Sequence, residues 1–146
     1  MASVPSEFVE SLVAVSRLMA MRLDTHAQDM GLTLSRARLL VRLGREDGQT
    51  QTQLAQRLGI ASSSVVALVD GLERAGFAER RAEEGDRRTR RVFLTDQARD
   101  RAADLEGFLS ASHADLLKNI PAGDLATANA VLARLLANLR NGSADD

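Results

Sequence analysis

The stretch that most constrains the fold is "TQTQLAQRLGIASSSVVALVDGLERAG", residues 50–76. Thr50 and Gln53 have the spacing of a capping box, which opens a helix, and Gly59 is suited to the left-handed backbone that ends one. One of the serines at 62–64 is expected to cap a second helix. The stretch therefore predicts two short helices joined by a tight turn.

Both predicted helices carry their apolar residues on one face. The first turns Leu54 and Leu58 inward, and Ala55 is small enough for the two helices to cross closely. The second has an apolar stripe at helical spacing and ends at Gly76. The members of this stripe are Val65, Leu68, Val69 and Leu72. This pattern is typical of a helix-turn-helix.

Two short segments with β-branched and aromatic residues follow directly. "FAERRA" and "RRVFLT" flank "EEGD", in which Gly85 suits a tight turn, so residues 77–95 predict a β-hairpin. A helix-turn-helix followed by a hairpin is a winged helix. We therefore predict a mainly α fold with a small β-hairpin wing, whose winged-helix lobe spans residues 32–95.

Long amphipathic segments lie on both sides of this lobe. Residues 6–31 have an apolar stripe at helical spacing and stop at Gly31. The stripe is Phe8, Leu12, Val15, Met19 and Leu23. A second helix, "LTLSRARLLVRLG", follows it, and Gly44 is expected to be its left-handed cap.

The C-terminal part predicts two further helices. Thr95 should cap a long helix that begins at Asp96 and is broken by Pro121, and a last helix begins near Ala122. A small domain cannot cover so much apolar surface, so residues 6–31 and 96–140 are predicted to form a homodimer. Residues 141–146 are expected to be a disordered tail.

Composition excludes several classes of protein. The chain has no cysteine, and its two histidines, His26 and His113, are too few for a histidine zinc site, so neither a metal nor a cofactor is expected. "ASSSV" is not a nucleophile elbow and no glycine-rich phosphate loop is present, so we do not expect an enzyme. No signal peptide or apolar run long enough for a membrane is found, which predicts a cytoplasmic protein.

The formal net charge of −1 conceals a local excess of arginine. The segment from Arg80 to Arg91 contains six arginines but only three acidic residues, Glu83, Glu84 and Asp86. Like charges at a hairpin tip repel one another, so an anionic partner is expected there. We expect Arg80 and Arg81, nearer the base of the hairpin, to pair with neighbouring glutamates.

The whole pattern resembles the MarR family of winged-helix transcriptional regulators. The similarity runs from the first long helix through "QLAQRLGIASSSVVALVDGLERAGFAERR" and "GDRRTRRVFLT" to the two C-terminal helices. The wing matches the family at its aspartate, arginine, valine, leucine and threonine positions, which are Asp86, Arg88, Val92, Leu94 and Thr95 in this sequence. The resemblance implies a triangular homodimer that binds palindromic operator DNA. It also implies repression, with release by a small molecule, often an aromatic acid, or by oxidation.

Physical chemistry assigns roles at a DNA interface. The serines Ser62, Ser63 and Ser64 would enter the major groove at the start of the recognition helix. Arg88 would insert into a narrow minor groove, with Arg87 and Arg90 on phosphates. Asp86 would orient one of these arginines. Backbone contacts are expected from Thr52, Gln53 and Arg74.

The resemblance also places an effector pocket among the first, second and fifth helices. The candidate lining residues are Met19, Arg22, Leu23, His26, Ala37, Arg38, Val41 and Phe108. Arg22, Arg38 or His26 would neutralise a carboxylate, or would simply be surface residues. Because Trp and Tyr are absent, any pocket is lined by aliphatic groups and Phe.

Two other functions are compatible with a winged helix. It can be a protein-interaction module without DNA specificity, in which case the wing arginines would not affect DNA binding. It can also be the dimerisation region of a small-molecule methyltransferase, but the sequence contains no cofactor-binding domain.

Overall fold

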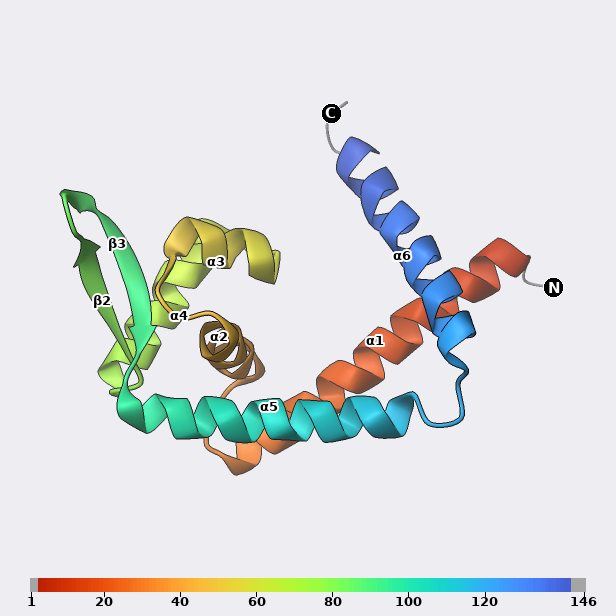
Figure 1. Ribbon diagram of the computed structural model, residues 1–146, viewed down its shortest axis with the longest axis horizontal. Coiled ribbons are helices and arrows are strands. Elements are labelled where there is room, and N and C mark those ends of the chain that lie inside the picture. Colours follow the sequence, from red (N-terminus) through yellow and green to blue (C-terminus); the bar gives the residue numbers. More distant parts are fainter. Residues whose placement is uncertain (1–2, 143–146) are drawn as a thin grey trace. The chain divides into compact units, whose positions relative to one another are not determined.

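The computed structural model describes residues 3–142. The chain divides into two compact units, Met1–Ser110 and Ala111–Asp146. The described elements are α1 (Val4–Asp29), α2 (Leu34–Arg45), β1 (Gln49–Thr50), α3 (Gln51–Leu58), α4 (Ser62–Arg74), β2 (Ala78–Glu83), β3 (Asp86–Leu94), α5 (Asp96–Leu116) and α6 (Ala122–Gly142). Helices with a small antiparallel sheet confirm the predicted mainly α winged-helix class (Figure 1).

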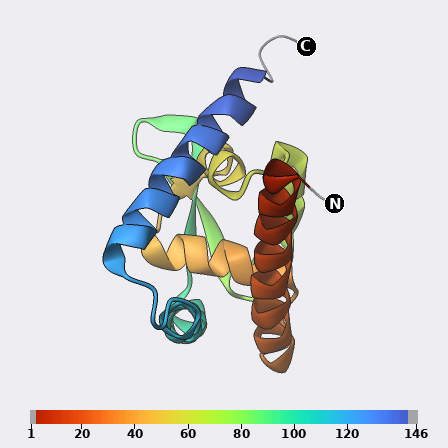
Figure 2. The same ribbon diagram turned by 90° about the vertical axis from the view of Figure 1, so that its right-hand side faces the viewer.

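Helix α2 is the centre of the first unit. It contacts α1, α3, α4 and β3, and Figure 2 shows it next to α1. Five of its residues are buried because its apolar positions recur at helical spacing. They are Ala37, Leu39, Leu40, Val41 and Leu43. The hydrophobic core therefore forms around this helix.

The prediction for Gly44 is wrong. Helix α2 continues through Gly44 to Arg45, and its cap is Glu46, with an extended φ of −147°. Gly44 instead permits close packing against α5, because a Cβ added to it would lie 3.0 Å from the Cβ of Ala102. The requirement for glycine comes from a distant helix, which local turn chemistry cannot reveal.

The two helices of the helix-turn-helix form as predicted, except at one cap. The capping box of Thr50 and Gln53 is present, and Gly59 ends α3 with a φ of +66°. The cap of α4, however, is Ala61, which makes no side-chain capping bond. The serines at 62–64 already belong to the helix, so their hydroxyls are not used as caps.

The hairpin is part of a three-stranded sheet of order β1-β3-β2. β1 was not predicted, since two residues are too few to show an alternating pattern. Its Gln49 pairs with Val92 and is buried. The Gln49 side chain donates to the carbonyl oxygens of Arg42 and Glu46 and accepts from Arg57, so its burial leaves no polar group unsatisfied.

Helix α5 begins as predicted. The Thr95 hydroxyl accepts a hydrogen bond from Ala98 N–H and donates one to the carbonyl of Gly76, which ties the start of α5 to the end of α4. The first half of α5 is held to the core by three buried residues, Ala98, Ala102 and Leu105.

In the second unit, Pro121 precedes α6, as expected of a helix breaker. Helix α6 continues to Gly142, two residues beyond the predicted boundary, and none of its residues is buried. The predicted disordered tail otherwise lies outside the described residues. Between residues 3 and 142, no helix has the length and apolarity to cross a membrane.

Candidate nucleic-acid interface

The arginines of the hairpin have different environments because successive residues of a strand point to opposite faces. Arg80 points toward the recognition helix α4. Its guanidinium pairs with Asp70 at 2.7 Å and with Glu73, and its Nε donates to the side-chain oxygen of Gln51 at 2.9 Å. The side chain is only 14% exposed. Arg80 therefore joins the hairpin to both α3 and α4.

Two further arginines, Arg81 and Arg91, also pair with carboxylates of the protein. They lie on the opposite face of the hairpin. Arg81 pairs with Glu79, and its guanidinium lies 4.5 Å from the centre of the Phe93 ring. Arg91 pairs with Glu83 at 2.8 Å. The expected pairing along the hairpin thus holds for Arg81, whereas the acidic partners of Arg80 are on α4.

The other hairpin arginines have no such partners. In residues 3–142, the side chains of Arg87, Arg88 and Arg90 are exposed and make neither a hydrogen bond nor an ion pair. Arg90 alternates with Val92 and so lies on the face that points toward the helices, whereas Arg87 and Arg88 lie where the register of the hairpin shifts. This end of the hairpin therefore carries three guanidinium groups that have no ion-pair partner in the described part of the chain.

The predicted role of Asp86 is corrected by its contacts. Its carboxylate accepts from the backbone N–H of Arg88 at 2.9 Å and from the Thr89 hydroxyl at 2.8 Å, and contacts no guanidinium. The hydrogen bond from the Arg88 N–H, followed by that from Thr89, lowers the pKa of Asp86 below its ordinary value. Asp86 shapes the turn that presents the arginines and does not orient their side chains.

The outward face of α4 completes the surface. Ser62, Ser63 and Ser64 are exposed, while Val65 and Val69 are fully buried. The hydroxyls of these serines make no hydrogen bond within the described part of the chain. They are therefore available at the positively polarised end of the helix.

The three remaining candidate contacts lie farther along these elements. Thr52 is exposed in the first turn of α3. Gln53 is exposed too, but its side-chain oxygen is already used by the backbone N–H of Thr50 at 2.9 Å. Arg74 is exposed at the last residue of α4, about 18 Å along the helix axis from Ser62. Arg74 is therefore better placed for a flanking phosphate than for a base contacted by the serines.

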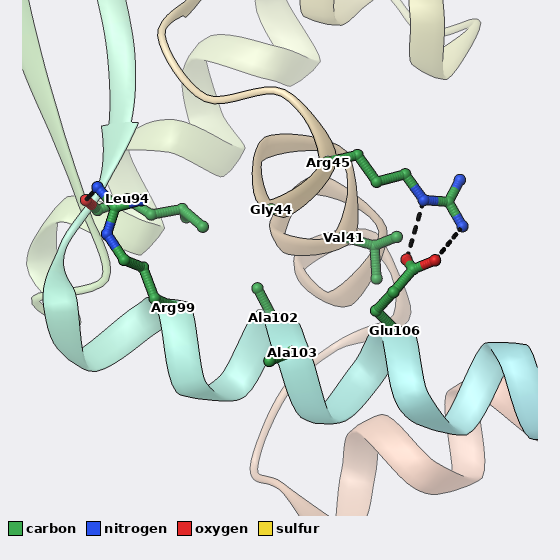
Figure 3. A pocket seen from close by; sticks show the side chains of 8 residues that line it. All are labelled: Val41, Gly44, Arg45, Leu94, Arg99, Ala102, Ala103 and Glu106. Atoms are coloured by element: carbon green, nitrogen blue, oxygen red, sulfur yellow. Dashed lines mark hydrogen bonds and ion pairs between the residues drawn. The ribbon is translucent and has the colours of Figure 1, made fainter.

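The predicted effector residues differ in burial, and Val41 is the one that lines the pocket described below. Leu23 and Ala37 are core residues, and Met19, Arg22 and Arg38 are exposed. Val41 does line a pocket, of about 420 Å³, between α2, the end of β3 and α5 (Figure 3). Its other lining residues are Gly44, Arg45, Leu94, Arg99, Ala102, Ala103 and Glu106. Seven of these eight residues were not predicted from the sequence, because they come together only through tertiary packing.

Both arginines at this pocket already have carboxylate partners. Figure 3 shows Arg45 reaching across from α2 to Glu106 on α5, with hydrogen bonds of 2.9 and 3.1 Å. Arg99 pairs with Asp47 at 3.1 Å. The rest of the lining is aliphatic. An anionic ligand would therefore have to compete with Glu106 or Asp47 for its counter-ion.

His26 belongs to a separate contact between α1 and α5. Its ring stacks on Phe108 with centroids 4.1 Å apart, and its Nε2 lies 3.6 Å from an Asp104 carboxylate oxygen. His26 is therefore a packing residue of the first unit and does not line the pocket. Among residues 3–142, no three side chains of His, Asp or Glu converge as metal ligands would.

These elements define a winged-helix protein, in which a helix-turn-helix and a basic hairpin present one joint surface. A family model described as the MarR family matches residues 30–89. The transcriptional regulator PA3341 shares 36% sequence identity with the chain, over 92% of this chain and 98% of that one, with a TM-score of 0.84. The chain therefore belongs to the MarR family of winged-helix transcriptional regulators.

Two more distant structures share the fold. A putative MarR family regulator from Listeria monocytogenes, complexed with 26mer DNA, has 16% identity and a TM-score of 0.83, covering 97% of this chain and 91% of its own. MepR from S. aureus, also solved as a DNA complex, has 20% identity and a TM-score of 0.80, covering 90% and 97%.

Proposed function

We propose that the protein is a sequence-specific DNA-binding transcriptional regulator that acts in the cytoplasm as a homodimer on a palindromic operator. The observation that carries this proposal is the division of the hairpin arginines. Arg80, Arg81 and Arg91 are neutralised within the protein, whereas Arg87, Arg88 and Arg90 are not. A surface that leaves guanidinium groups unpaired suits a polyanion.

The hairpin and α4 have complementary roles in this proposal. The serine end of α4 enters the major groove, while Arg88 reaches the minor groove and Arg87 and Arg90 contact phosphates. In the dimer, the two recognition helices would lie about 34 Å apart, one turn of DNA, so that both enter the same side of the duplex. Two proteins of the same fold were solved as DNA complexes, which supports DNA as the partner.

A titration with DNA tests the proposal. The probe is a duplex selected by the wild-type protein from a random library, and its affinity is measured at several salt concentrations. Arg88→Ala is expected to weaken binding and to reduce the salt slope by about one unit for each half-site, or about two units for the dimer, if each Arg88 neutralises one phosphate. Arg81→Ala is the matched control, because its guanidinium is already paired with Glu79. An unchanged affinity and slope for Arg88→Ala would favour the protein-interaction module instead.

Exposed apolar residues support the homodimer. On α1, Phe8, Leu12, Val15 and Met19 lie at helical spacing and are 37–45% exposed. Such a stripe is stabilised by burial against a second copy. Sedimentation should show a dimer for the wild-type protein and dissociation for Leu12→Asp. A monomeric wild-type protein at micromolar concentration would contradict the dimer.

We propose that the protein is a repressor and that a small-molecule effector releases it from DNA by occupying the pocket at Val41 and Ala103. The pocket joins α2, in the core of the DNA-binding lobe, to α5, so a bound molecule can favour one arrangement of these helices. A coupling of about 1 to 3 kcal/mol would be enough for a strong switch.

The ion pair of Arg45 and Glu106 predicts the chemistry of this effector. Benzamide, which is neutral, should raise the melting temperature of the wild-type protein more than benzoate, which must displace Glu106. Glu106→Gln should reverse this order, because it leaves Arg45 without its carboxylate. Ala103→Leu, at an exposed lining position, should abolish both effects by filling the pocket. Equal shifts in all three proteins would contradict an effector at this site.

A further inference from the structure

The recognition helix carries an exposed valine that the core does not explain. Its buried stripe consists of Val65, Val69 and Leu72, all with no exposed surface. Val66 is 38% exposed and is not among the partly buried residues that pack against the core, whereas Leu68 is. Val66 therefore points away from the core, on the face that the serines share.

The neighbours of Val66 make this part of the face apolar. Ser62 lies one turn before it and Asp70 one turn after it, and the adjacent exposed residue is Ala67. No long hydrogen-bonding side chain leaves the outward face between Ser62 and Asp70. This turn therefore lacks the side chains that read base edges through bidentate hydrogen bonds.

The turn of the helix at Val66 is also held in position and electrically balanced. The guanidinium of Arg80 donates to the carbonyl oxygen of Val66 at 3.4 Å and pairs with Asp70 at 2.7 Å. The Asp70 carboxylate would otherwise repel DNA one turn further along the helix. Arg80 thus lets this part of the face approach a duplex closely.

We propose that Val66, beside the small Ala67, selects thymine in the operator by contacting its 5-methyl group. Thymine is the unmodified base that presents an apolar group in the major groove, and aliphatic side chains recognise it by direct contact. Ala67 leaves room for the helix backbone to come close to the base edge. This inference rests on the proposed function, because it requires α4 to lie in the major groove.

Deoxyuridine tests the contact, since it keeps every hydrogen-bonding group of thymine and lacks only the methyl group. Each thymine of the selected duplex is replaced in turn, symmetrically in both half-sites. At one position the wild-type affinity should fall about fourfold for each substituted half-site, the effect of one buried methyl group. Val66→Ala should bind the thymine and deoxyuridine duplexes equally and keep the salt slope of the wild-type protein.

Ile60→Ala is the matched control, because Ile60 is a 37% exposed aliphatic residue in the turn before α4. It should retain the wild-type response to deoxyuridine. The thymine readout is overturned if no position responds in the wild-type protein, or if Val66→Ala responds as the wild type does. In either case, the proposed function would still be supported if the wild-type protein binds the selected duplex with an affinity that falls as the salt concentration rises. Failure to bind any duplex at low ionic strength would overturn both proposals.

Discussion

Arg80 gives the sharpest test of how the hairpin is attached to the helix-turn-helix. Replacing it by alanine removes a guanidinium that contacts Asp70, Glu73 and Gln51 and is 14% exposed. Hydrogen bonds to charged groups each stabilise a fold by about 1.5 to 3 kcal/mol when buried. These bonds are not additive, and the two carboxylates are partly hydrated after the substitution. We therefore expect Arg80→Ala to lower the free energy of unfolding by about 2 to 3 kcal/mol.

Arg81→Ala is the matched control in the neighbouring position of the same strand. The Arg81 side chain is 56% exposed, and its pairing with Glu79 lies on the surface. Surface ion pairs contribute about 0 to 1 kcal/mol, so we expect a small change. Arg80→Lys should be intermediate, because one ammonium group cannot replace the fork that reaches α3 and α4 together.

Urea unfolding at equal protein concentrations measures these differences, because the stability of a dimer depends on its concentration. The midpoint should fall clearly for Arg80→Ala with an unchanged slope, and little for Arg81→Ala. If both variants lose the same stability, the hairpin is not anchored through Arg80. A DNA titration of Arg80→Ala should also show weaker binding, since the hairpin and α4 would no longer be held in register.

Three further predictions concern the fold. Gly48→Ala should destabilise the protein by about 1 to 3 kcal/mol in thermal unfolding. The reason is that Gly48 has a φ of +70° and that an added Cβ would lie 2.8 Å from the Phe93 ring. An unchanged stability would contradict this steric argument. Leu105→Ala should cost about 2 to 5 kcal/mol by the same measurement, because its side chain is fully buried; a loss under 1 kcal/mol would contradict the packing. The pKa of Asp86 is lowered, so its stabilisation is present above its ordinary value of 3.8 and is lost as the pH falls through the folded value. The stability difference between wild type and Asp86→Asn should therefore be constant at neutral pH and shrink in acid, and a difference independent of pH would refute it.

Much of the site is predictable because it depends on local chemistry. The serines at 62–64 are placed by the glycine turn before them, and Gly85 places the wing tip at the correct position. The roles of the six hairpin arginines are less predictable. Arg80 and Arg81 are adjacent in sequence, yet strand alternation sends one to α4 and the other to a glutamate on its own strand.

The sequence alone determines the helices, the capping box of α3 and the hairpin, because helical periodicity, capping boxes and turn glycines act over a few residues. Only the tertiary structure decides which arginine side chains remain unpaired and can bind a partner, and where the pocket lies. Gly44 shows the reason. Its lack of a side chain matters only because Ala102, 58 positions later, packs against it. Such contacts depend on how elements meet in space, and no local pattern records them.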